Sequence, residues 1–197
     1  MARGLEWAEF GRHLTEPWTV AIVGRPNAGK SSLMNTLAGF QRSIVNATPG
    51  TTRDAVTLDV AFDGWPVRLI DTAGLRESAD ELESAGIERA RDVIATADLV
   101  VQVFDSTEGA VERMPGAIVV ANKIDLALNA SWPAEFVPVS ALTGAGVDEL
   151  AARIVAELIP ESPPEGMAIP VCQEQVEWLA ASVTKGRWHA TGRKRPG

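Results

Sequence analysis

Eight consecutive residues, Gly24-Arg-Pro-Asn-Ala-Gly-Lys-Ser31, have the types and spacing needed to bind nucleotide phosphates. Glycines let the main chain wrap tightly, so that successive N–H groups point at phosphate oxygens. The Lys30 ammonium adds a positive charge beside the outer phosphates, and the Ser31 hydroxyl can bind magnesium. The loop alone leaves open whether the nucleotide is ATP or GTP. The residues expected to touch the phosphates are Asn27, Ala28, Gly29, Lys30, Ser31 and Ser32.

A second motif, Asn122-Lys-Ile-Asp125, predicts which base is bound. The Asp125 carboxylate can accept hydrogen bonds from N1–H and the 2-amino group of guanine. Adenine offers neither donor and would leave that carboxylate desolvated and unpaired. Asn122 and Lys123 would brace the ring and the phosphate loop. A further contact to the base is expected from the Ala141 N–H, within the triplet Ser140, Ala141 and Leu142.

The third group of residues would sense the terminal phosphate. In Asp71-Thr-Ala-Gly74, Asp71 can hold magnesium through water, and the Gly74 N–H can contact the γ-phosphate. Thr51 and Thr52 lie in a stretch expected to be a loop, and Thr52 is the one we expect to reach magnesium. Together with Lys30, these residues predict a magnesium-dependent enzyme that hydrolyses GTP to GDP and phosphate.

Three segments, residues 24–32, 49–54 and 71–77, together resemble the tRNA-modification GTPases of the MnmE (TrmE) family. The resemblance continues through residues 80–83 and 86–90 and covers roughly residues 15–160. The first segment is shared with the ribosome-assembly GTPases Der and Era. Leu75 stands where Ras-type enzymes carry a water-orienting glutamine, so a different catalytic device is needed.

The family resemblance implies that potassium takes the place of an arginine finger. Its ligands would be Asn27 and main-chain carbonyls at about Asn46 to Thr48, and Glu83 would orient the attacking water. Two plainer alternatives stay open. Asn27 would then only shape the turn, and Glu83 would only favour a helix start. The resemblance also implies a transient homodimer through the switch regions, which are the segments around Thr52 and Gly74.

The order of predicted elements indicates how these residues are brought together. Short apolar runs alternate with longer amphipathic stretches, which is typical of an α/β fold. We expect a Ras-like P-loop domain with a doubly wound, mostly parallel sheet and one antiparallel edge hairpin, turning at Asp63-Gly64. Strands are predicted over 18–23, 56–62, 67–70, 99–104, 117–121 and 136–139, and helices over 29–37, 84–97 and 147–159.

Four parts are expected along the chain: an N-terminal helical extension (1–16), the GTP-binding domain (17–160), a proline-rich linker (161–170), and a C-terminal helix with a basic tail (171–197). A helix is predicted over 4–14 and another over 172–184. An ordinary relative has a helix where this chain has only the short stretch 105–116, so we expect one side of the sheet to be uncovered there. The folate-binding domain and the C-terminal cysteine motif of MnmE have no counterpart in this sequence, so its tRNA chemistry is not carried over.

Composition narrows the class of protein. The formal net charge of −8 argues against sequence-independent nucleic-acid binding by the whole surface, although residues 192–195 form a small basic cluster. The sequence has no apolar run long enough to span a membrane, and its single cysteine, Cys172, fits a reducing cytoplasm.

The competing interpretation is a nucleotide-gated binding module of the Era or Der type, which acts on ribosome or RNA with slow hydrolysis as a timer. A degenerate, inactive domain is disfavoured by the intact motifs. An RNA or a tRNA-modification protein is the expected partner besides GTP and GDP.

Overall fold

The computed structural model describes residues 7–40, 56–72, 83–108, 112–127, 131–161, 163–164 and 167–184. The chain divides into two compact units. One comprises residues 17–160, and the other combines residues 1–16 with residues 161–197. Each unit is described by itself.

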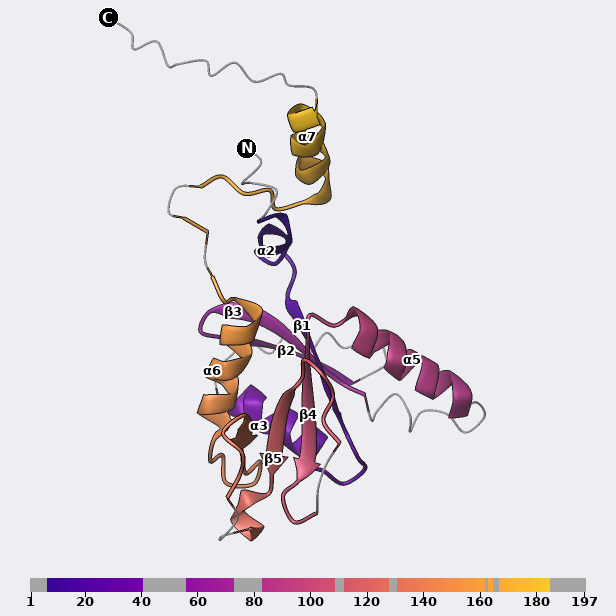
Figure 1. Ribbon diagram of the computed structural model, residues 1–197, viewed down its shortest axis with the longest axis vertical. Helices are drawn as coiled ribbons and strands as arrows, with labels where there is room; N and C mark the ends of the chain where they lie inside the picture. The colour runs from indigo at the N-terminus through magenta and orange to yellow at the C-terminus, as the bar shows by residue number, and fades with distance from the viewer. Residues whose placement is uncertain are drawn as a thin grey trace, which may run out of the picture. The chain divides into compact units, whose positions relative to one another are not determined.

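The larger unit is built on a six-stranded sheet with the order β2-β3-β1-β4-β5-β6 (Figure 1). All neighbouring strands are parallel except β2 and β3. The strands are β1 Trp18–Gly24, β2 Val56–Phe62, β3 Trp65–Asp71, β4 Leu99–Asp105, β5 Ile118–Asn122 and β6 Phe136–Pro138. Asp63 and Gly64 have φ values of 50° and 84° and form the tight turn of the edge hairpin. The predicted α/β fold and its antiparallel edge are therefore confirmed.

Helices cover both sides of this sheet: α3 (Lys30–Phe40), α5 (Glu83–Thr96) and α6 (Val147–Leu158) (Figure 1). The core is aliphatic because the central parallel strands have apolar residues on both faces. Ile22 of β1, Leu33 and Leu37 of α3, and Leu150 and Ile154 of α6 are fully buried.

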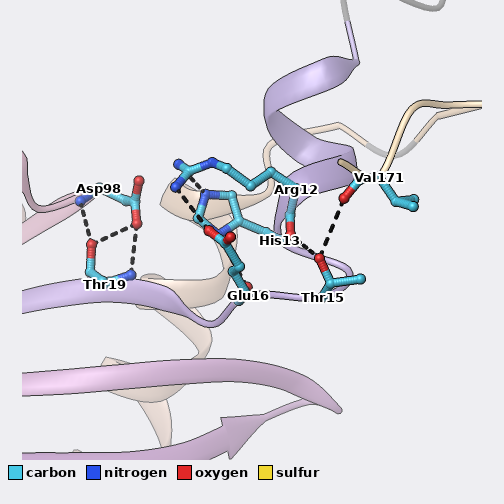
Figure 2. Close-up of polar contacts among 7 residues, drawn as sticks. All are labelled: Arg12, His13, Thr15, Glu16, Thr19, Asp98 and Val171. Carbon is cyan, nitrogen blue, oxygen red and sulfur yellow. Dashed lines mark hydrogen bonds and ion pairs between the residues drawn. The ribbon is translucent and has the colours of Figure 1, made fainter. Parts of the chain in front are cut away.

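A hydrogen-bonded clamp joins β1 to the start of β4 (Figure 2). The Asp98 Oδ2 accepts hydrogen bonds from the Thr19 N–H and the Thr19 hydroxyl, both at 2.7 Å. The Asp98 N–H donates in turn to the Thr19 carbonyl at 3.0 Å. Because this clamp lies just before Leu99, it fixes the register in which Val20 pairs with Leu99. The carboxyl ends of β1 and β4 are thereby aligned.

The described residues between β4 and β5, 106–108 and 112–117, form no helix, as the sequence predicted. The sheet is nevertheless covered beside them. Gln102 of β4 donates to the Glu112 carbonyl at 2.7 Å and accepts from the Met114 N–H at 2.8 Å. Phe104 is buried under Trp132 and Phe136. The expectation of an uncovered face is therefore wrong at Phe104, because aromatic rings replace the missing helix.

In the smaller unit, the N-terminal and C-terminal segments contact each other. Helix α2 spans Ala8–Arg12 and α7 spans Gln173–Thr184, shorter than the predicted 4–14 and close to the predicted 172–184. The Thr15 hydroxyl donates to the Val171 carbonyl at 3.4 Å (Figure 2). A side chain at Gly11 would lie 1.9 Å from the Pro170 carbonyl oxygen, so glycine is needed for this approach. None of the helices within the described residues is long and apolar enough to cross a bilayer.

Candidate nucleotide-binding site

The phosphate loop joins β1 to α3, and its shape depends on main-chain conformations that few residues adopt. Gly24, Asn27 and Gly29 have φ values of 150°, 64° and 87°. A side chain at Gly24 would lie 2.1 Å from the Val103 carbonyl oxygen. The buried Lys30 ammonium donates to the carbonyls of Gly24 at 3.1 Å and Arg25 at 2.9 Å. The loop therefore curls around the lysine that is expected to meet the phosphates.

The expected magnesium ligands lie together at the start of α3 and the end of β3. The Ser31 hydroxyl donates to Asp71 Oδ2 at 2.6 Å, and Asp71 is only 2% exposed. The next residue is also fixed, because the Thr72 N–H and hydroxyl both donate to the Ile22 carbonyl. Hydroxyl and carboxylate oxygens are the donors that Mg²⁺ prefers, so this pair fits the metal.

Asn122 links the phosphate loop to the loop after β6. Its side chain is 1% exposed. The amide Nδ2 donates to the Ala28 carbonyl at 2.8 Å, and Oδ1 accepts from the Ala141 N–H at 3.0 Å. The expected bracing role of Asn122 therefore has a definite geometry. The Ala141 N–H, expected to reach the base, donates to Asn122 in this structure.

Asp125 lies in the short 3₁₀-helix η1 (Ile124–Leu126). The residue before this helix, Lys123, has the left-handed conformation with a φ of 66°. The fully buried Ser140 hydroxyl donates a short hydrogen bond to Asp125 Oδ1. Asp125 itself is half-buried, and Leu142 at the rim is 85% exposed. Ser140 therefore orients the carboxylate that is expected to read guanine.

Two contacts at the candidate site escaped the sequence analysis. Lys123 Nζ lies 2.6 Å from Asp105 Oδ2 at the end of β4. The Thr36 hydroxyl of α3 donates to the Ala141 carbonyl at 2.7 Å. A signal for the first existed, because Asp105 ends a predicted central strand and must therefore lie beside the end of the next one. No sequence pattern marks the second.

Several predicted site residues lie outside the described part of the chain. They are Asn46, Thr48, Thr52, Gly74 and Leu75. Glu83 is the first residue of α5, but its side chain is not described. Asn27 is exposed and has a positive φ, a conformation that asparagine tolerates better than most residues. Its geometry is compatible with both shaping the turn and binding a cation.

Comparison with known families identifies the larger unit. Residues 19–129 match the model of a GTPase family described as 50S ribosome-binding GTPase. The chain is 45% identical over 177 residues to the tRNA modification GTPase MnmE of Koribacter versatilis, covering 82% of this chain and 38% of the relative. It is 46% identical over 168 residues to MnmE of Moorella thermoacetica, covering 75% and 36%. The chain thus spans less than half the length of these relatives.

Solved structures give the same fold. The G domain of the T. maritima FeoB iron transporter aligns with a TM-score of 0.53 and 29% identity, covering 72% of this chain and 99% of that domain. The FeoB G-domain of Methanococcus jannaschii aligns with a TM-score of 0.53 and 26% identity, covering 73% and 99%.

Proposed function

The chain belongs to the 50S ribosome-binding GTPase family with a G domain of the MnmE type, and from this we propose that it hydrolyses GTP to GDP and phosphate in a potassium-activated reaction. One observation carries the guanine-nucleotide part of this proposal. The buried Asn122 amide joins the phosphate loop at Ala28 to the base loop at Ala141. The phosphate site and the base site are therefore two ends of one hydrogen-bonded unit.

The phosphate end binds and orients the triphosphate. The Lys30 ammonium would exchange its loop carbonyls for β- and γ-phosphate oxygens, which are stronger acceptors for a cation. Ser31 and Asp71, with Thr52, would hold magnesium, which when bound neutralises charge on the outer phosphates. The Gly74 N–H would contact the γ-phosphate. The base end, through Asp125, selects guanine over adenine because adenine leaves the carboxylate unpaired.

The catalytic device beyond magnesium is proposed from the family. Asn27, with main-chain carbonyls at Asn46 and Thr48, would hold potassium, and Glu83 would orient the attacking water. A cation beside the phosphates supplies electrostatic stabilisation that an arginine supplies in other GTPases. The exposed side chain of Asn27 is accessible for this role.

The test is single-turnover GTP hydrolysis in potassium and in sodium at equal ionic strength. We expect hydrolysis in potassium to be faster by about a hundredfold, the lower end of what one electrostatic donor contributes. Asn27→Ala should remove the potassium dependence, and Glu83→Ala should slow hydrolysis with GDP affinity kept. Glu88→Ala, an exposed change further along α5, is the matched control. Equal rates in the two salts would exclude the potassium mechanism, and an unchanged Glu83 variant would remove that residue from the chemistry.

The cellular role is proposed from the relatives. Their name, tRNA modification GTPase, suggests a part in tRNA modification. We propose with it a cytoplasmic location and a tRNA-modification protein or an RNA as partner. A transient homodimer through the switch regions is expected when GTP and potassium are bound. Light scattering with a non-hydrolysable GTP analogue in potassium should double the mass, whereas GDP should not.

A second candidate is a nucleotide-gated binding module of the Era or Der type, favoured by the description of the matched family as ribosome-binding. Slow hydrolysis would then time its attachment to ribosome or RNA. Cosedimentation with 50S subunits in GTP and in GDP discriminates the two. Nucleotide-dependent cosedimentation together with slow, potassium-independent hydrolysis would favour the module.

A further inference from the structure

The residues at the end of β4 contact both the phosphate loop and the base motif that begins at Asn122. Asp105 is the last residue of β4 and pairs in register with Asn122, the last residue of β5. The Ser106 N–H donates to the Asn122 carbonyl at 2.8 Å, so the chain after β4 follows the base motif closely. At its far end, Glu108 lies 3.6 Å from Arg25 of the phosphate loop. We call residues 105–108 the β4 turn.

Asp105 is the most constrained group in the β4 turn. Its Oδ1 accepts from the Thr107 N–H at 2.9 Å and the Thr107 hydroxyl at 2.7 Å, while Oδ2 contacts Lys123 Nζ at 2.6 Å. Burial alone would raise the pKa of Asp105, but the hydrogen bonds from Lys123 and Thr107 outweigh it and lower that pKa. The carboxylate is therefore held ionised, with Thr107 fixing one oxygen and Lys123 the other.

The direction of the Lys123 side chain follows from this anchor. A methyl group at Gly29 would lie 3.9 Å from Lys123 Cε, so the lysine stem runs alongside the phosphate loop. The ammonium at its tip forms an ion pair with Asp105. Two residues further on, Asp125 presents the carboxylate expected to read guanine. An anchored stem beside the phosphate loop offers an apolar surface on which a planar base can pack.

We propose that Asp105 is a positioning residue for guanine nucleotides, which holds the Lys123 stem beside the phosphate loop so that the stem supports the bound base. The inference rests on the proposed GTP binding and adds a determinant of how long the nucleotide stays bound. It assigns Asp105 no contact with the reacting phosphate.

The β4 turn supplies its own control. The Arg25–Glu108 ion pair lies at the other end of the turn, but its side chains are 71% and 44% exposed, against 32% and 11% for Lys123 and Asp105. Exposed pairs contribute little, because water and salt screen them. Glu108→Gln removes the same charge from the same turn as Asp105→Asn, without touching Lys123.

The experiment measures release of fluorescent GDP from the wild type, Asp105→Asn, Lys123→Met, the double variant and Glu108→Gln. We expect Asp105→Asn to accelerate release about tenfold, since a charged hydrogen bond is lost. In the Lys123→Met background the same change should add less than about twofold, because it acts through Lys123. The turnover of Asp105→Asn at saturating GTP should stay within about twofold of the wild type, so that the effect of this change lies in KM rather than kcat.

Three results would overturn the proposal: release from Asp105→Asn no faster than from Glu108→Gln, a full effect that persists in the Lys123→Met background, or a loss confined to kcat. If Asp105→Asn does not fold, Thr107→Val carries the test. It removes one hydroxyl bond to Asp105 and should accelerate release about threefold, and unchanged release would count against the proposal. Failure of the wild type to bind GDP would instead refute the proposed function itself.

Discussion

The two halves of the nucleotide site are held by different means. The phosphate half is shaped by the main chain: Gly24 and Gly29 adopt positive φ values, and Lys30 bonds to carbonyls of its own loop. The base half is shaped by side chains, since Ser140 orients Asp125 and Asp105 anchors Lys123. Asn122 is the residue that contacts both halves.

This difference has consequences for substitution. A main-chain conformation is lost as a whole when one glycine gains a side chain, because neighbouring N–H groups move together. Side-chain contacts can be removed one at a time, and each loss is limited to the interactions that the one side chain makes. We therefore expect single changes in the phosphate half to be severe and changes in the base half to be graded.

The largest effect is expected from Gly29→Ala. The φ of 87° strains any side chain there, and the new methyl group would lie 2.3 Å from Asn122 Nδ2. Both the loop and the linking amide must then shift, and we expect GDP affinity to fall by about a hundredfold or more. Calorimetric titration with GDP measures this. Gly64→Ala is the control, because its φ of 84° is similar but no atom lies within 4 Å. Equal affinities of the two variants would contradict the main-chain basis of the phosphate half.

The next effect concerns the base half. Asp125→Asn replaces one carboxylate oxygen by an NH₂ group, which would face the 2-amino group of guanine. We expect GDP affinity to fall by about a hundredfold, since a donor then opposes a donor. Xanthosine diphosphate, with an oxygen at that position, should bind the variant better than GDP. Competition titrations with the two nucleotides measure the switch, with Asp148→Asn on the exposed face of α6 as control. If the variant kept its preference for guanine, Asp125 would not be the base-reading residue.

Much of the fold could be predicted because local signals agreed with the tertiary structure. The apolar runs at 99–104 and 117–121 lie within one residue of the observed β4 and β5, since buried parallel strands need apolar residues on both faces. The Asp63-Gly64 turn was predicted from its conformational preference alone. The cover over Phe104 could not be predicted, because Trp132 lies outside every predicted element and nothing in the predicted strand 136–139 marks where the Phe136 side chain points.

For the site, the sequence identified which residues meet but not how they are held. The positions of Ser31, Asp71, Asn122 and Asp125 follow from motifs that end strands at one edge of the sheet. Hydrogen bonds between separate elements, such as Thr36 of α3 to Ala141 and Lys123 to Asp105 of β4, depend on side-chain directions that no pattern encodes. Potassium binding and the role of Glu83 stay predictions.

A smaller loss of GDP affinity should follow from Ser140→Ala. This change tests whether different side chains of the base half contribute different amounts to GDP binding. The change removes the donor to Asp125 Oδ1 and an acceptor for the Thr143 N–H. Loss of one hydrogen bond to a charged group should weaken GDP binding by about tenfold, with hydrolysis at saturating GTP unchanged. Thr143→Ala, at an exposed neighbour, should change affinity by less than about twofold. A loss as large as that of Asp125→Asn would mean that Ser140 itself contacts the base.

The smallest effect concerns pH and tests whether the base half depends on an ionised Asp105. The pKa of Asp105 is lower in the folded protein than its ordinary value of about 3.9. The ionised carboxylate therefore stabilises the fold above the unfolded-state pKa, and this contribution is lost as pH falls through the lower folded-state pKa. Asp105→Asn cannot titrate.

The difference in free energy of unfolding between wild type and Asp105→Asn should thus be constant from about pH 5.5 to 8, at about 1 kcal/mol, and should shrink below about pH 4. Urea unfolding at a series of pH values measures it, with Asp148→Asn as the exposed control. A difference that already shrinks between pH 7 and 6 would show that the pKa of Asp105 is raised rather than lowered in the folded protein, which contradicts a carboxylate held ionised by Lys123 and Thr107. The contribution of the base half to stability would then change between pH 7 and 6. The main-chain contacts of the phosphate half would not change in that range, because main-chain groups do not titrate there.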